Sequence, residues 1–107
     1  MRVLFGLLAA MLGLLGCGPG ADDIPFEGQF FRTQLKDTEA RHRFIVTASP
    51  VSASLEGARE AARYEATIYC VRNFGNSRIT WRVGPDDPVE VLPIANDTLT
   101  LEGECPQ

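Results

Sequence analysis

The chain has 107 residues, with 10 basic and 14 acidic side chains and a formal net charge of −4 at pH 7. This length leaves room for one domain. The acidic balance argues against nucleic-acid binding and leaves no basic patch for anionic lipid headgroups.

The N-terminus has the parts of an export signal. Arg2 is followed by an unbroken run of apolar residues and glycine over residues 3–15. This run suits the apolar region of a signal peptide and is too short to span a bilayer core comfortably as a helix. We therefore expect residues 1–16 to be a signal peptide.

The motif that ends this run is Leu14-Leu15-Gly16-Cys17. It resembles the lipobox of bacterial lipoproteins, in which a leucine three places before the cysteine and a glycine directly before it are typical. The resemblance implies cleavage between Gly16 and Cys17 and attachment of lipid to the Cys17 thiol. Two or three acyl chains hold a protein stably at a membrane, whereas one chain is marginal. The alternatives are an ordinary cleaved signal with an incidental cysteine, or an uncleaved N-terminal helix.

Residues 17–27 are expected to form the lipidated cysteine and a flexible tether, and residues 28–107 a single domain. The tether segment is rich in glycine, proline and aspartate and has no apolar periodicity. In Gram-negative lipoproteins an aspartate after the lipidated cysteine resembles a signal for retention in the inner membrane. Gly18 stands at that position, which favours the cell envelope at the periplasmic face of the outer membrane.

Two strands are expected at the start of the domain. Residues 29–35 begin with aromatic side chains and end with polar ones, which is typical of a partly covered edge strand, and residues 43–49 have β-branched residues at their centre. The charged segment 36–41 between them predicts a hairpin. Pro50 ends the second strand, because proline has no N–H for the next ladder bond.

The strongest element is a helix predicted over residues 54–74. Ser54 is a suitable N-cap, alanines favour the helix, and Gly75 or Asn76 provides a left-handed stop. One line of mostly small side chains faces inward and lets the helix lie close to a sheet: Leu55, Ala58, Ala62, Ala66, Cys70 and Phe74.

Alternating patterns follow the helix. Residues 78–83 place Ile79, Trp81 and Val83 on one face. A turn cluster covers residues 84–88, and residues 89–94 are at best an edge segment because Pro93 interrupts them. Residues 97–105 alternate again, with Leu99, Leu101, Gly103 and Cys105 on one face.

The two cysteines of the domain are predicted to form a disulfide. Cys70 and Cys105 are an even pair in a chain that we expect to be exported, where a disulfide is the default. Cys70 lies on the inner line of the helix and Cys105 on the inward parity of the last strand, so both face the same interface. Two separate buried thiols are the alternative.

The expected fold is α+β. An antiparallel sheet of about four strands in the order β-β-α-β-β carries one helix on one face. The run from Ala58 through Tyr69-Cys70 to Gly75 and Trp81 resembles small uncharacterised lipoproteins of Gram-negative bacteria, loosely over residues 44–105. That resemblance implies a domain type and carries no activity.

The sequence contains no recognisable catalytic set. His42 lies in a charged segment with no orienting partner nearby in the sequence. Asp86 and Asp87 with Asp97 match no calcium loop, and one histidine with two bridged cysteines cannot make a zinc site. We therefore expect no enzyme, metal, cofactor or small-molecule substrate.

Arg78 and Arg82 are expected on the outer face of the sheet. Such a face is usually only solvated, and contact with an anionic partner is the more specific alternative. Three functional hypotheses follow. The first is an envelope lipoprotein that serves as a structural or protein-interaction module. The second is a sensor or accessory subunit that docks an envelope partner through these arginines. The third and weakest is a small hydrolase.

Overall fold

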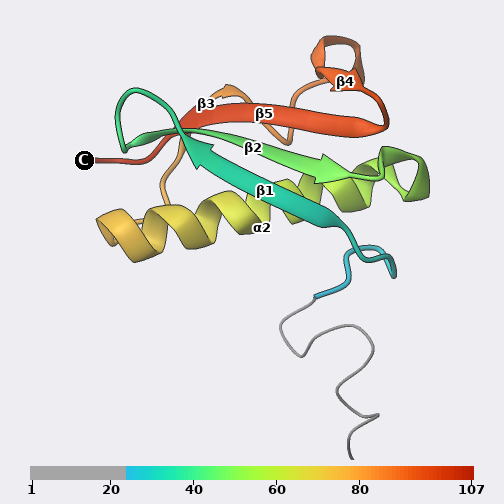
Figure 1. The fold of residues 1–107 in the computed structure, drawn as a ribbon, viewed down its shortest axis with the longest axis horizontal. Helices are drawn as coiled ribbons and strands as arrows, with labels where there is room; N and C mark the ends of the chain where they lie inside the picture. The colour runs from blue at the N-terminus through green and yellow to red at the C-terminus, as the bar shows by residue number, and fades with distance from the viewer. Residues whose placement is uncertain (1–23) are drawn as a thin grey trace, which may run out of the picture.

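The structure is a computed structural model and describes residues 24–107 (Figure 1). The expected signal peptide, Cys17 and most of the expected tether lie outside the described residues. In chain order the elements are β1 (Arg32–Asp37), β2 (Arg43–Ser49), the 3-10 helix η1 (Val51–Ala53), α2 (Leu55–Phe74), β3 (Thr80–Val83), the 3-10 helix η2 (Val89–Val91), β4 (Ile94–Ala95) and β5 (Thr98–Glu104). The fold is α+β, as the sequence predicts: an antiparallel five-stranded sheet carries α2 on one face.

The sheet has the strand order β1-β2-β5-β3, and β4 also pairs with β5. Because β2 occupies one side of β5, both β3 and β4 pair along its other side. β3 meets the Glu104 end of β5 and β4 meets the Thr98 end. β4, which begins in the range predicted to be at best an edge segment, is only two residues long.

Two strands begin later than the sequence predicts. β1 begins at Arg32 instead of residue 29, because Gln29 exchanges both backbone hydrogen bonds with Phe26 across a tight turn. β3 begins at Thr80 instead of residue 78, so Arg78 lies in the connection before the strand. Phe26 falls within the range expected for the tether and nevertheless packs against the core.

The helix α2 has the ends that its sequence predicts. The Ser54 hydroxyl accepts a hydrogen bond from the Gly57 N–H at 2.9 Å, which satisfies one of the free donors of the first turn. Gly75 adopts a left-handed φ of 71°, and its N–H donates to the carbonyl of Val71 at 2.9 Å. Between these two caps the helix runs along one face of the sheet (Figure 1).

The core lies between α2 and the central strands. The buried helix residues are all small, namely Gly57, Ala58, Ala61, Ala62, Ala66 and Cys70. Opposite them the register pairs Val46 with Leu101 and Ala48 with Leu99, which are fully buried. Small side chains on the helix thus allow larger ones on the sheet to fill the interface at close range.

An aromatic cluster closes the end of the core nearest the disulfide. The rings of Phe44 and Trp81 meet edge to face, with centroids 5.5 Å apart. A Cβ on Gly103 would lie 3.0 Å from an atom of each ring, so glycine leaves the space that the two rings occupy. Within residues 24–107, no helix combines the length and apolar character needed to cross a membrane.

Candidate functional site

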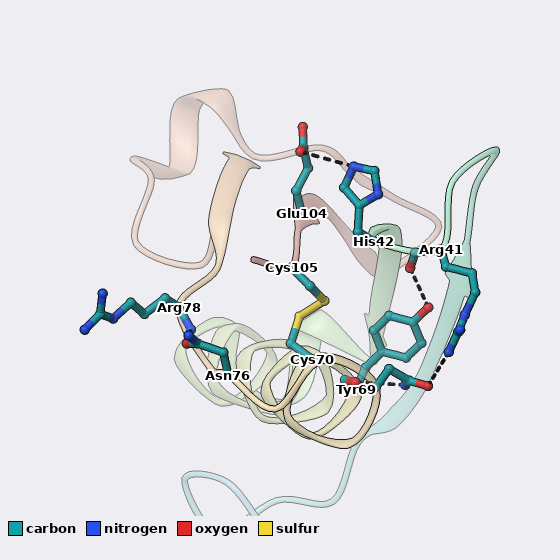
Figure 2. The surroundings of a disulfide bond; sticks show 9 residues. Arg41, His42, Tyr69, Cys70, Asn76, Arg78, Glu104 and Cys105 are labelled. Atoms are coloured by element: carbon teal, nitrogen blue, oxygen red, sulfur yellow. Dashed lines mark hydrogen bonds and ion pairs between the residues drawn. A yellow bond between two sulfur atoms is a disulfide. The ribbon is translucent and has the colours of Figure 1, made fainter. Parts of the chain in front are cut away.

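The predicted disulfide is confirmed. Cys70 and Cys105 are bonded, with Cα atoms 5.3 Å apart and a sequence separation of 35 residues. The two residues are 0% and 3% exposed. Figure 2 shows the bond joining the helix to the segment that follows β5, so the last strand is covalently fixed to α2.

Hydrogen bonds tie a third segment to this corner. The Cys105 N–H donates to the backbone carbonyl of His42 at 2.7 Å. The Tyr69 hydroxyl donates to the backbone carbonyl of Arg41 at 2.7 Å (Figure 2). The segment that leads into β2, the helix and the residues after β5 therefore meet in one cross-linked corner.

The side chain of His42 finds partners here that its sequence neighbours do not reveal. Its Nε2 lies 3.7 Å from a carboxylate oxygen of Glu104 (Figure 2). Its Nδ1 lies 3.1 Å from the Gln107 side-chain nitrogen. A histidine that activates a side-chain nucleophile needs a hydroxyl or thiol beside it, and the two cysteines of this corner are bonded to each other. The arrangement is a cross-strand polar contact beside the disulfide.

The two arginines expected on one sheet face are placed differently. Arg82 lies on β3, its side chain is 83% exposed, and its Nη1 is 4.0 Å from a carboxylate oxygen of Glu102. Arg78 lies before β3, where its backbone N–H donates to the Asn76 side-chain oxygen at 2.9 Å. Its side chain extends outward from the domain (Figure 2). Both arginines are accessible, but only Arg82 belongs to the sheet.

A shallow cleft of about 470 Å³ lies beside Arg82. Its charged lining consists of two arginines, Arg43 and Arg82, and three glutamates, Glu39, Glu102 and Glu104. Arg43 already lies 3.6 Å from Glu104. Since carboxylates outnumber guanidinium groups, the cleft is a poor site for a strongly anionic ligand.

The aspartates weighed for calcium have structural partners in this fold. Asp86 forms an ion pair with Arg63, and Asp87 accepts a hydrogen bond from the Gly84 N–H at 3.0 Å. Asp97 accepts from the N–H and the hydroxyl of Ser52 at 2.8 and 2.7 Å. In the part of the chain that the structure describes, no three histidine, cysteine or acidic side chains are grouped to hold a metal ion.

The Arg63–Asp86 ion pair perturbs both groups. A hydrogen bond from Arg63, and then its positive charge, lower the pKa of Asp86 below its ordinary value. The hydrogen bond to Asp86 is also the main reason that the pKa of Arg63 is raised. The Asp86 side chain is 81% exposed, so solvent weakens the interaction. The ion pair helps to hold the loop 84–88 against the helix.

Arg59 holds the same loop, a role that its sequence neighbours do not indicate. Its Nη1 donates to the backbone carbonyls of Pro85 and Asp87 at 2.9 and 2.7 Å. Only 13% of its side chain is exposed. Arg59 thus satisfies two carbonyls of a loop that has little regular structure of its own.

The sequence matches no protein-family model, and neither a curated protein nor a solved structure gives a significant match.

Proposed function

We propose that the protein is a membrane-anchored lipoprotein of the bacterial cell envelope, held by lipid on Cys17 and serving as a structural or protein-interaction module. The observation that carries this proposal is the motif Leu14-Leu15-Gly16-Cys17 after an apolar run. The proposed location is the periplasmic face of the outer membrane, because Gly18 stands where an inner-membrane retention signal would place aspartate.

The disulfide fits the same compartment. Disulfides form and persist in exported proteins and are rare in the reducing cytosol. The chain has three cysteines, and Cys70 and Cys105 are bonded to each other. Cys17 is then the one thiol left for modification, which fits its proposed role as the lipid attachment site.

Mass spectrometry of the N-terminal peptide tests the anchor directly. In a bacterial host the protein should be cleaved between Gly16 and Cys17, carry diacylglycerol on Cys17 and sediment with membranes. A Cys17→Ala variant should lack the lipid and leave the membrane pellet. The double variant Cys70→Ala/Cys105→Ala is the matched control, because it removes the other two cysteines and should keep the lipid. An unmodified Cys17 in membrane-bound wild-type protein would refute the proposal.

The interaction role is tested by cross-linking in intact cells, followed by purification of the lipidated protein. A structural or interaction module should recover the same envelope protein in repeated preparations. A Cys17→Ala variant should recover it less efficiently, because it is no longer confined to the membrane. Repeated recovery of no partner at all would count against an interaction module.

A second candidate is a sensor or accessory subunit that docks through Arg78 and Arg82. The 83% exposure of the Arg82 side chain favours it, whereas the three neighbouring glutamates weaken the attraction for an anionic partner. The double variant Arg78→Glu/Arg82→Glu should abolish cross-linking to the partner if these arginines dock it. Arg72→Glu, an exposed change on the helix, is the control, and unchanged cross-linking of the double variant would exclude this candidate.

A further inference from the structure

Residues 24–31 form a small folded unit directly before β1, which we call the anchor hairpin. Phe26 and Gln29 exchange both backbone hydrogen bonds, at 2.8 and 2.9 Å, across the turn residues Glu27 and Gly28. Both turn residues have positive φ, 52° and 74°, the combination that defines a type I′ hairpin turn. The part of the chain that follows the expected tether therefore has a defined shape.

The anchor hairpin packs closely against the helix α2. The ring of Phe31 lies 2.7 Å from the position that a Cβ on Gly57 would take. The ring of Phe26 packs on that of Tyr64, with centroids 5.6 Å apart. Because the hairpin is packed on α2, any surface that it contacts also fixes the direction of the helix.

Apolar side chains remain exposed around this unit. Ile24 is 43% exposed, Phe30 is 50% exposed and Tyr64 is 40% exposed. Ile24 and Tyr64 line one small cavity together with Phe26 and Phe31. The half-exposed Tyr64 ring has an apolar body and a polar hydroxyl, a combination that suits the boundary between water and lipid.

The length of chain between the proposed lipid and the hairpin limits where the domain can be. Six residues separate Cys17 from Ile24, a reach of about 25 Å at most. The headgroup layer itself is roughly 5–8 Å thick on each side of the hydrocarbon core. The anchor hairpin is therefore the part of the domain that a lipid on Cys17 would hold nearest to the bilayer, and such tethering makes even weak contacts effective.

We propose that the anchor hairpin is a membrane-contact element, which rests its exposed apolar side chains in the lipid interface and orients the domain. This inference depends on the proposed anchor at Cys17. The contact is apolar and not electrostatic, because the chain carries a net charge of −4 and Glu27 stands at the hairpin tip. It should therefore persist at high salt and need no anionic lipid.

The proposal assigns an orientation to the domain. In Figure 1 the anchor hairpin and β4 lie on opposite sides of the molecule, with the helix and sheet between them. With the hairpin on the lipid, β4 and the neighbouring η2 point away from the membrane. The exposed aliphatic side chains of that region, Val89, Val91 and Ile94, are then on the far side.

The test uses the chain from Cys17 onward, coupled through the Cys17 thiol to a maleimide lipid in phosphatidylcholine nanodiscs. Cys70 and Cys105 are bonded and buried, so coupling is selective. A gadolinium-chelating headgroup lipid then broadens the NMR signals of amides close to the bilayer. We expect broadening several-fold stronger for residues 26–31 than for residues 89–95, with the same gradient at about 0.5 M salt, where the Debye length is below 5 Å.

The double variant Ile24→Ser/Phe30→Ser removes two exposed apolar side chains of the anchor hairpin and leaves the ring contact that holds it on the helix. It should largely abolish this gradient, and an unchanged gradient would overturn the contact. Val91→Ser is the matched control, since it removes a 58% exposed apolar side chain on the far side and should leave the gradient unchanged. Equal broadening over the whole domain, or stronger broadening at residues 89–95, would overturn the contact. Chemical coupling keeps this result separate from the proposed function, which fails instead if Cys17 from cells carries no lipid.

Discussion

The ring of Phe31 occupies the space in which a side chain at Gly57 would begin. A Cβ on Gly57 would lie 2.7 Å from two ring carbons of Phe31 and 2.9 Å from the backbone oxygen of Phe26. Gly57 is buried in the first turn of α2, although glycine is a poor helix former. The missing side chain allows the anchor hairpin to lie against the helix.

The Gly57→Ala variant is expected to be less stable than the wild type. At an open helical position this change stabilises a protein by about 1 kcal/mol. At Gly57 it overfills a packed site, which costs about 1–3 kcal/mol, and the backbone of Phe26 cannot move aside as a flexible side chain could. Urea unfolding followed by circular dichroism measures the difference.

The coupling between these two positions provides the control. In a Phe31→Ala background the ring no longer fills the site, so Gly57→Ala should cost less than it does in the wild type. A thermodynamic cycle over the four proteins isolates this coupling. Equal costs in both backgrounds would show that the Phe31 ring is not the source of the strain. A stabilised single variant would show that the hairpin yields without strain.

Removal of the disulfide is expected to destabilise the domain substantially. The bond closes a loop with a separation of 35 residues, for which the chain-entropy relation gives about 4 kcal/mol. That is a large share of the roughly 5–15 kcal/mol that holds an ordinary domain together. The urea midpoint of Cys70→Ala/Cys105→Ala should therefore fall well below that of the wild type.

The resistance of the wild-type protein to reductant provides a second check on the bond. Both cysteines are buried, so the native protein should resist mild reductant and lose the bond only when denaturant is present. Digestion without reductant should yield one peptide pair that joins Cys70 to Cys105. Free thiols at both positions in natively exported protein would contradict the structure.

Elements with complete local signals were predictable from the sequence. β2 covers the range 43–49 that its β-branched centre predicts. The helix has the N-cap and the glycine stop expected of its sequence. The disulfide followed because the periodicity of the helix and the parity of the last strand place Cys70 and Cys105 toward one interface.

The missed features depend on turns or on distant pairing. The sequence patterns place residues 24–27 of the anchor hairpin in the tether and residues 29–31 in the first strand, although Glu27-Gly28 is a pair that suits a type I′ turn. The turn between β4 and β5 is of the same kind, with φ of 53° and 60° at Asn96 and Asp97. Asn96-Asp97 is a pair that suits such a turn, but Pro93 interrupts the preceding segment and removes the strand pattern that marks a hairpin.

The polar contacts of the site required the strand register. Glu104 reaches His42 because β2 and β5 pair Arg43 with Glu104. Arg59 reaches the loop 84–88 only after β3 has been placed at the far edge of the sheet. A single sequence fixes neither strand order nor register, so these roles could not be read from it.

Arg59→Met is expected to destabilise the protein by about 1–3 kcal/mol. Methionine keeps much of the apolar stem but leaves the carbonyls of Pro85 and Asp87 without the donor that now binds both. The loop should loosen, so the Asp87 amide, which donates to the Gly84 carbonyl, should exchange faster with deuterium. Urea unfolding and hydrogen exchange measure the two effects.

Arg72→Met is the matched control for this change. Arg72 is an exposed arginine in the last turn of the same helix, and surface changes of this kind usually stay within about 0.5 kcal/mol. The two variants have the same change of charge and length. Equal effects on stability and on Asp87 exchange would remove the special role of Arg59.

The Arg63–Asp86 ion pair predicts a small loss of stability in acid. Since the pair lowers the pKa of Asp86 in the folded state, it stabilises the protein above the ordinary aspartate pKa of about 3.9. This contribution disappears as the pH falls through the lower folded pKa. The stabilities of the wild type and Asp86→Asn should therefore differ at about pH 5–7 and converge below about pH 3. Urea unfolding across this range gives the difference directly, because the other carboxylates contribute to both proteins. In an Arg63→Gln background the pH dependence of this difference should shrink to the smaller effect of the Arg59 charge on the pKa of Asp86. A wild-type difference that stays constant with pH would contradict the ion pair as its cause.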